Sequence, residues 1–251
     1  MRIEDGVLLE VDGTEHEIIL PNDVTVIAQG VFENNRNIEV LSFADHKIHK
    51  VDIMSRAFKD SSIIFADIVP LSVGVQAFLG CTALIPPTAF FSELEEIEHS
   101  AFSFTSINRV ELPKCKIIGA FAFSDCFNLE QFHAPHIQRM EQGILSGCIS
   151  LNQVELSYTD TLPQELSDIT IEKLTVHINN IRTIQSFIKD MLFLKELTII
   201  SNGNTTIGKG AIVNCPNLLK IRYTTNISFD VDSIDEPDNI DLSILERELL
   251  V

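Results

Sequence analysis

Three residues with acid–base side chains, Glu111, His133 and Glu155, stand 22 residues apart, counted from 111 to 133 and from 133 to 155. A histidine flanked by two carboxylates can transfer protons or hold a metal ion, provided that the fold brings the three side chains together. A chain that folds back on itself every 22 residues would do so. The chemistry of these residues therefore depends on whether the chain is a repeat.

Other chemical motifs carry less weight. The segment Gly208-Lys209-Gly210 lacks the rest of a phosphate-binding loop. The five cysteines form neither a disulfide framework nor a metal motif, because their number is odd and their spacing is irregular. We therefore expect no cofactor, no metal and no catalytic residue, and a reduced, intracellular protein.

The pair Ala122-Phe123 marks a repeat that recurs along most of the chain, and we call its second residue the marker. The markers are Phe32, Phe58, Phe78, Phe102, Phe123, Leu145, Leu166, Ile188 and Ile212. Successive markers are 20 to 26 residues apart, for example from 58 to 78 and from 32 to 58. This period is typical of repeats in which each unit supplies one strand and one return segment.

The cleanest repeat, residues 118–135, shows how the pattern would fold. Leu129, Phe132 and Ala134 have the spacing of a half-buried strand, and Pro135 would end that strand because proline donates no ladder hydrogen bond. A cysteine follows several markers by three residues, where it serves as a small apolar filler, whereas Cys115 lies in a polar loop. One repeat cannot bury its apolar face alone, so stacked repeats must form the core.

The pattern IGxxAFxxCxxLxxhxhP at 118–135 resembles the BspA-type (Treponema pallidum-type) leucine-rich repeat. The resemblance implies an α/β repeat solenoid, a leucine-rich-repeat horseshoe with a parallel concave sheet. It also implies that the chain is related to proteins of host-associated bacteria and of protists. Many of those proteins are surface adhesins, and others lack export signals.

We expect one domain over residues 1–251. Residues 1–20 would form an N-terminal hairpin cap that turns at Asp12-Gly13, 21–223 would hold eight to nine repeats, and 224–251 would be an acidic linker and a short C-terminal helix beginning at Asp241. Residues 181–194 have helical apolar spacing and predict a second helix, residues 162–166 a helical turn, and Pro86-Pro87 a local break.

The register at 129–135 also predicts which side chains form the exposed ladder of the concave sheet. Its first column would run Val40, Phe65, Pro86, Arg109, Gln131, Gln153, Lys173, Glu196 and Lys220. Its second column would run Ser42, Asp67, Thr88, Glu111, His133, Glu155, Thr175, Thr198 and Arg222. We take Phe65, Asp67, Arg109, Glu111, Gln131, His133, Gln153 and Glu155 as candidate partner-binding residues. An open, wet sheet is a poor place for catalysis, so a protein contact surface is expected instead of an active site.

The net charge of -18 argues against direct binding of nucleic acid or of an anionic membrane. It keeps the protein soluble and leaves a basic protein partner as one option. The first residues lack the apolar run of a signal peptide, which favours a cytoplasmic protein, or an extracellular one if a leader was removed. The main hypothesis is a non-enzymatic interaction scaffold or adaptor. The alternatives are the ligand-binding ectodomain of an adhesin or receptor, and an acidic decoy of a nucleic-acid-binding protein.

Overall fold

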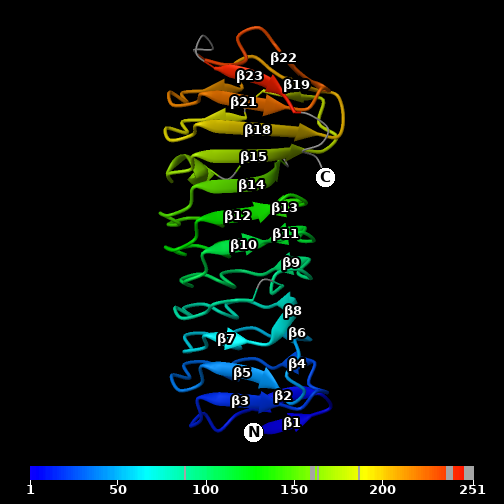
Figure 1. Ribbon diagram of the computed structural model, residues 1–251, viewed down its shortest axis with the longest axis vertical. Helices are drawn as coiled ribbons and strands as arrows, with labels where there is room; N and C mark the ends of the chain where they lie inside the picture. Colours follow the sequence, from blue (N-terminus) through cyan, green and yellow to red (C-terminus); the bar gives the residue numbers. More distant parts are fainter. Residues whose placement is uncertain (88, 159–161, 163, 186, 236–239, 246–251) are drawn as a thin grey trace. The chain divides into compact units, whose positions relative to one another are not determined.

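The computed structural model describes residues 1–87, 89–158, 162, 164–185, 187–235 and 240–245 (Figure 1). In this part of the chain, short strands are joined by turns, and the only helical element is one 3-10 turn, η1 (Gln164–Ser167). The fold is a parallel-sheet β-solenoid. The helices that the expected α/β class requires are not found in the described residues, so this part of the expectation is wrong. The helical turn expected at 162–166 corresponds to η1. The horseshoe form stays a prediction.

The chain divides into two compact units, and the single domain expected from the sequence stays a prediction. The N-terminal unit comprises residues 1–129 and 139–149, and the C-terminal unit comprises residues 130–138 and 150–251.

In the N-terminal unit, short strands build two sheets. The first has the order β1 (Arg2–Glu4), β2 (Val7–Glu10), β4 (Val26–Ile27), β6 (His49–Ile53), β8 (Ile68–Val73), β9 (Glu96–Ile97), β11 (Ile117–Ile118) and β13 (Arg139–Met140). The second has the order β3 (Glu17–Leu20), β5 (Val40–Phe43) and β7 (Phe65–Ala66), and β10 (Arg109–Glu111) also belongs to this unit. Only the β1–β2 pair is antiparallel among the pairs described in this unit.

In the C-terminal unit, the strands fall into three parallel sets. The largest has the order β12 (Gln131–Ala134), β14 (Gln153–Tyr158), β15 (Lys173–Ile178), β18 (Glu196–Ser201), β21 (Lys220–Tyr223) and β23 (Asp241–Ile244). The others are β16 (Thr183–Ile184), β19 (Thr205–Ile207) and β22 (Ile227–Phe229), and the pair β17 (Ile188–Lys189) with β20 (Ile212–Val213).

The marker phenylalanines form a stacked column inside the N-terminal unit. Ring centroids are 4.7 Å apart for Phe32–Phe58, 4.9 Å for Phe58–Phe78, and 5.3 Å for both Phe78–Phe102 and Phe102–Phe123, with near-parallel planes. All five side chains are buried. The period of the sequence thus becomes a continuous aromatic core, which is the role expected for the markers.

The cysteine position ties three repeats to the repeats before them. The thiols of Cys81, Cys126 and Cys148 donate to the marker carbonyl oxygens of the preceding repeats at 2.9, 3.2 and 3.1 Å. All five cysteines are free thiols. Cys115 lies in the expected loop between exposed Lys114 and Lys116, but its side chain is fully buried and its thiol donates to the Ile117 carbonyl.

Two residues in most repeats adopt left-handed backbone conformations with positive φ. One stands two residues before the marker: Gly30, Arg56, Gln76, Ser100, Phe121, Gly143 and Gly210. The other stands two residues after it: Asn34, Asp60, Gly80, Phe104, Asp125, Gly147, Asp190 and Asn214. Asn, Asp and Gly tolerate this conformation best, and they fill the second position in all of these repeats except that of Phe104. These paired residues turn the chain back at each repeat.

The helix expected at 181–194 is wrong. The described residues of this segment form β16, β17 and turns, and Ile184, Phe187, Ile188 and Met191 are buried. Strands of two residues separated by tight turns bring an apolar side chain inward every three or four residues. That spacing imitates one face of a helix.

The N-terminal hairpin exists, but its expected turn is wrong. Its strands are β1 and β2, and the turn is Asp5-Gly6, both with positive φ, as a two-residue hairpin loop requires. The segment after Asp12-Gly13 leads instead into β3, which pairs in parallel with β5.

The C-terminal expectation is also wrong where the structure describes it. Residues 224–235 continue the solenoid, because β22 pairs with β19 and Ile234 bridges to Ile212. Residues 241–244 form β23 beside β21 instead of the start of a helix. The rest of the expected linker and helix, 236–239 and 246–251, lies outside the described residues.

Candidate functional site

The polar ladder of the C-terminal unit has the register expected from the sequence. Its first column is Gln131, Gln153, Lys173, Glu196 and Lys220, and its second column is His133, Glu155, Thr175, Thr198 and Arg222, each residue aligned with the next across neighbouring strands. We call these ten residues the ladder face. Lys173 is exposed, and the other nine are partly buried. The strand β23 extends both columns by Asp241 and Ser243, which the sequence did not reveal.

Alternation along the strands creates this face. The side chains between the ladder residues point inward and are at most 1% exposed: Phe132, Val154, Leu174, Leu197 and Ile221. Each strand therefore buries every second residue and presents the others to solvent. A shift of one residue would bury the polar set, so burial fixes the register.

Glu155 is the best-connected carboxylate of the ladder face. Its Oε1 lies 2.6 Å from Nε2 of His177, and both side chains are about three-quarters buried, with exposed fractions of 28% and 22%. The hydrogen bond with His177 holds the pKa of Glu155 below its usual value, with further lowering by the charges of His133 and His136, while burial opposes the shift.

His177 was missed in the sequence because the predicted strands ended too early. The strand β15 runs to Ile178, two residues beyond Val176, and aligns His177 with Ser157 of β14. The alternation of Leu174, Val176 and Ile178 was the available signal.

The ladder face carries both signs of charge. Arg222 Nη2 lies 3.8 Å from Glu196 Oε2, and Lys220 Nζ lies 4.0 Å from Asp241 Oδ2. These pairs are exposed and contribute little to stability, but they give the surface a fixed pattern of donors and acceptors. Among the described residues, no group of three or more His, Cys, Asp or Glu side chains is arranged to hold a metal ion.

The other candidate residues belong to the N-terminal unit. Phe65 in β7 is 37% exposed and lies directly across from Val40 of β5. The side chain of Asp67, two residues further along the chain, is partly exposed. Arg109 and Glu111 pair with each other within β10, with Nε at 2.7 Å from Oε1. Glu111 is thus in the other unit from His133 and Glu155. The ladder position Pro86 lies outside any strand, at the expected break, and Thr88 is outside the described residues.

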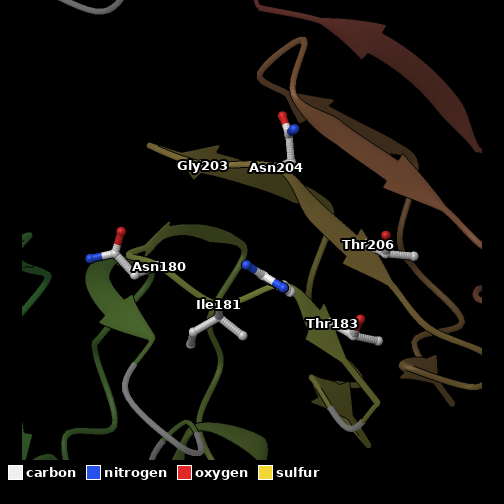
Figure 2. Close-up of a pocket in the computed structure, with 7 residues that line it drawn as sticks. Asn180, Ile181, Thr183, Gly203, Asn204 and Thr206 are labelled. Atoms are coloured by element: carbon white, nitrogen blue, oxygen red, sulfur yellow. The ribbon is translucent and has the colours of Figure 1, made fainter.

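A polar depression of about 700 Å³ opens elsewhere in the C-terminal unit (Figure 2). It is lined by Asn180, Ile181, Arg182, Thr183, Gly203, Asn204 and Thr206. Thr183 of β16 and Thr206 of β19 are aligned across neighbouring strands, and Figure 2 shows their side chains pointing the same way. This depression offers amides, hydroxyls and one cation to a polar ligand.

In the part of the chain that the structure describes, no helix is long and apolar enough to cross a membrane. The architecture and the ladder face together define a β-solenoid repeat protein with an open polar surface.

The family of the chain follows from comparison with known repeats. The chain matches the family model of the BspA type leucine-rich repeat region in six copies, over residues 15–119, 51–164 and 116–235. The chain therefore belongs to the BspA-type leucine-rich-repeat family. No curated protein matches it.

Three solved structures are similar at low identity. A leucine-rich repeat protein from Bacteroides ovatus is 16% identical with a TM-score of 0.46, covering 95% of this chain and 73% of its own. A leucine-rich cell surface protein from Faecalibacterium prausnitzii is 14% identical with a TM-score of 0.34, covering 93% and 80%. The pneumococcal vaccine antigen PcpA is 15% identical with a TM-score of 0.34, covering 96% and 86%.

Proposed function

We propose that this chain is a non-enzymatic protein-interaction module that binds a protein partner through the ladder face. The observation that carries the proposal is the aligned double column of polar and charged side chains over a fully buried apolar layer. Such a surface is rigid before binding, so the solenoid would lose little conformational entropy when a partner binds. Mixed charge favours a specific partner over an acidic decoy of nucleic-acid-binding proteins, which would need one contiguous acidic stripe.

The test uses two matched double variants of the full chain in a pulldown from the lysate of the source organism. Thr175→Arg with Thr198→Arg puts two large cations side by side on the ladder face. Thr183→Arg with Thr206→Arg makes the same chemical change at two aligned positions of the β16–β19 pair in the same unit.

The proposal expects a partner that is retained by the wild type and by the Thr183/Thr206 variant, and lost by the Thr175/Thr198 variant. Circular dichroism must show that both variants are folded. A partner that survives on the Thr175/Thr198 variant, or that is lost equally from both, refutes binding through the ladder face.

The second candidate is a ligand-binding surface adhesin, because the resemblance to BspA-type repeats implies many surface proteins. Cytoplasmic location stays a prediction. An antibody against this chain, applied to intact and to permeabilised cells, separates the two candidates: staining of intact cells favours the adhesin, and staining only after permeabilisation favours the intracellular module.

A further inference from the structure

Phe104 breaks the local rule of its repeat. It stands two residues after the marker Phe102 and has a φ of +57°, at the position where the other repeats of the pattern place Asn, Asp or Gly. A bulky aromatic residue is strained in this conformation. The strain yields no burial in return, because the side chain is 47% exposed.

The other phenylalanine with positive φ among the described residues, Phe121, is explained by packing. A Cβ at Gly143 would lie 2.4 Å from the ring of Phe121, so this glycine makes room for the ring. The ring also packs edge-to-face on His99 with centroids 5.9 Å apart. Phe104 has no comparable burial, and strain that is retained without such compensation points to a function.

Phe104 forms an exposed aromatic pair with Phe127 of the next repeat. The ring centroids are 6.4 Å apart and the planes meet at 78°, and Phe127 is 49% exposed. The two rings line a hollow of about 130 Å³ together with Thr82, Thr105, Ser106, Asp125 and Asn128. We call these seven residues the aromatic hollow.

The frame of the aromatic hollow is fixed by hydrogen bonds. The amide of Phe104 donates to the carbonyl of Ser124 at 2.9 Å, and Thr105 Oγ1 donates to the carbonyl of Phe102 at 2.8 Å. The hydroxyl of Ser106 donates to the Thr82 carbonyl. The backbone that carries Phe104 is therefore held in place before any ligand arrives.

The charge of the aromatic hollow favours a cationic ligand. Asp125 is the single charged residue that lines the hollow, and it makes no ion pair within the described residues. The whole chain carries a net charge of -18. Aromatic faces and a carboxylate together attract a planar cation, which can stack on a ring while its N–H groups face the carboxylate.

We propose that the aromatic hollow binds an arginine side chain of a basic protein partner. Arginine fits better than lysine because its guanidinium group is planar, weakly hydrated and able to stack. This contact belongs to the N-terminal unit and stands independently of the ladder face in the C-terminal unit.

The test measures fluorescence anisotropy of a labelled peptide, Gly-Arg-Gly-Arg-Gly, titrated with the full chain at about 0.15 M salt, where long-range attraction is screened. The comparison peptide contains citrulline in place of arginine, which keeps the shape and removes the charge. The proposal expects the citrulline peptide to bind at least about tenfold more weakly.

Three variants locate the contact. Phe104→Asn installs the residue type usual at this position, and Asp125→Asn removes the charge while keeping a residue that tolerates positive φ. Each should weaken binding of the arginine peptide about tenfold. Asp60→Asn is the matched control, since Asp60 has the same place in another repeat and lies outside the hollow. It should bind as the wild type does, and Phe104→Asn should melt at the same temperature as the wild type or higher.

Four results would overturn the proposal. The first is equal binding of the arginine and citrulline peptides, which would indicate an apolar or polar occupant. The second is an equal loss in Asp60→Asn and Asp125→Asn, which would indicate general charge attraction. The third is no binding of the arginine peptide at millimolar concentration. The fourth is a dimer in analytical ultracentrifugation that dissociates in Phe104→Asn, which would make a second copy of the chain the occupant.

Discussion

Replacing Phe78 by alanine should remove the centre of the stacked column. The ring is fully buried, stacks on Phe58 at 4.9 Å and on Phe102 at 5.3 Å, and meets the edge of Phe90 at 5.6 Å. Burial of a phenylalanine and the cavity that its loss leaves amount to about 3–5 kcal/mol. A typical domain is stable by only about 5–15 kcal/mol, so this one change removes a large share.

The assay is urea unfolding followed by circular dichroism, with Phe78→Ala, Phe78→Leu and Phe193→Ala compared with the wild type. Leucine is the natural marker at position 145, so Phe78→Leu should cost only about 1–2 kcal/mol. Phe193 is 49% exposed, and its loss should cost less than about 1 kcal/mol. The slope of the unfolding curve reports whether the transition stays cooperative.

The reasoning fails if Phe78→Ala costs no more than Phe193→Ala. The stacked rings would then be a consequence of the repeat and not a main source of its stability. A normal midpoint with a much shallower slope would mean that the repeats on either side of the gap unfold separately.

Three further outcomes follow from the same structure. Burial raises the pKa of Cys81 to about 12, so in the native protein iodoacetamide at mildly alkaline pH should modify the half-exposed Cys215 first, and early labelling of Cys81 would contradict its burial. The hydrogen bond with His177 lowers the pKa of Glu155, so the stability that this carboxylate contributes is complete above its usual pKa of 4.5 and is lost as pH falls through the lower native value. Glu155→Gln should therefore flatten the acid side of a plot of urea midpoint against pH, and an unchanged slope would exclude the coupling. Gly147→Ala should cost about 1–3 kcal/mol in thermal or urea unfolding, because φ is +75° and a Cβ would lie 2.4 Å from a carboxylate oxygen of the preceding repeat, whereas wild-type stability would refute the strain.

The sequence predicted the parts of the fold that depend on repeated apolar spacing. The markers stack as expected, and the ladder columns from Gln131 and His133 onward keep the expected register. The stacking depends on apolar markers that recur every 20 to 26 residues, and the register depends on burial of every second strand residue. The local break at Pro86-Pro87 followed from the missing N–H of proline.

The errors share a physical cause. Strands of two residues give no alternation to recognise, so the segment 181–194 resembled a helix. The last repeat was missed because Ser233-Ile234 replaces the Ala-Phe pair, although both residues are buried. The hairpin was misplaced because two Asp-Gly pairs compete near the N-terminus, and propensity does not rank them.

The ladder face could be predicted only in part. Periodicity placed Glu155 beside His133, as the strand pairing has it. It did not reveal His177, because strand length depends on tertiary pairing. The aromatic hollow was also beyond sequence reasoning, since Phe104 looks like one more apolar residue until its φ is known.

The hydrogen bonds between successive repeats have a consequence for the length of the protein. In the N-terminal unit the amide of Phe58 donates to the carbonyl of Ala77, that of Phe78 to Ala101, and that of Phe102 to Ala122, each at 2.8 Å. These repeats therefore meet through the same backbone donor and the same backbone acceptor. A gene that lost or duplicated one whole period would encode a chain in which each junction is still chemically complete. Repeat number can thus drift during evolution at little cost, whereas a deletion of part of a period would leave buried donors without acceptors.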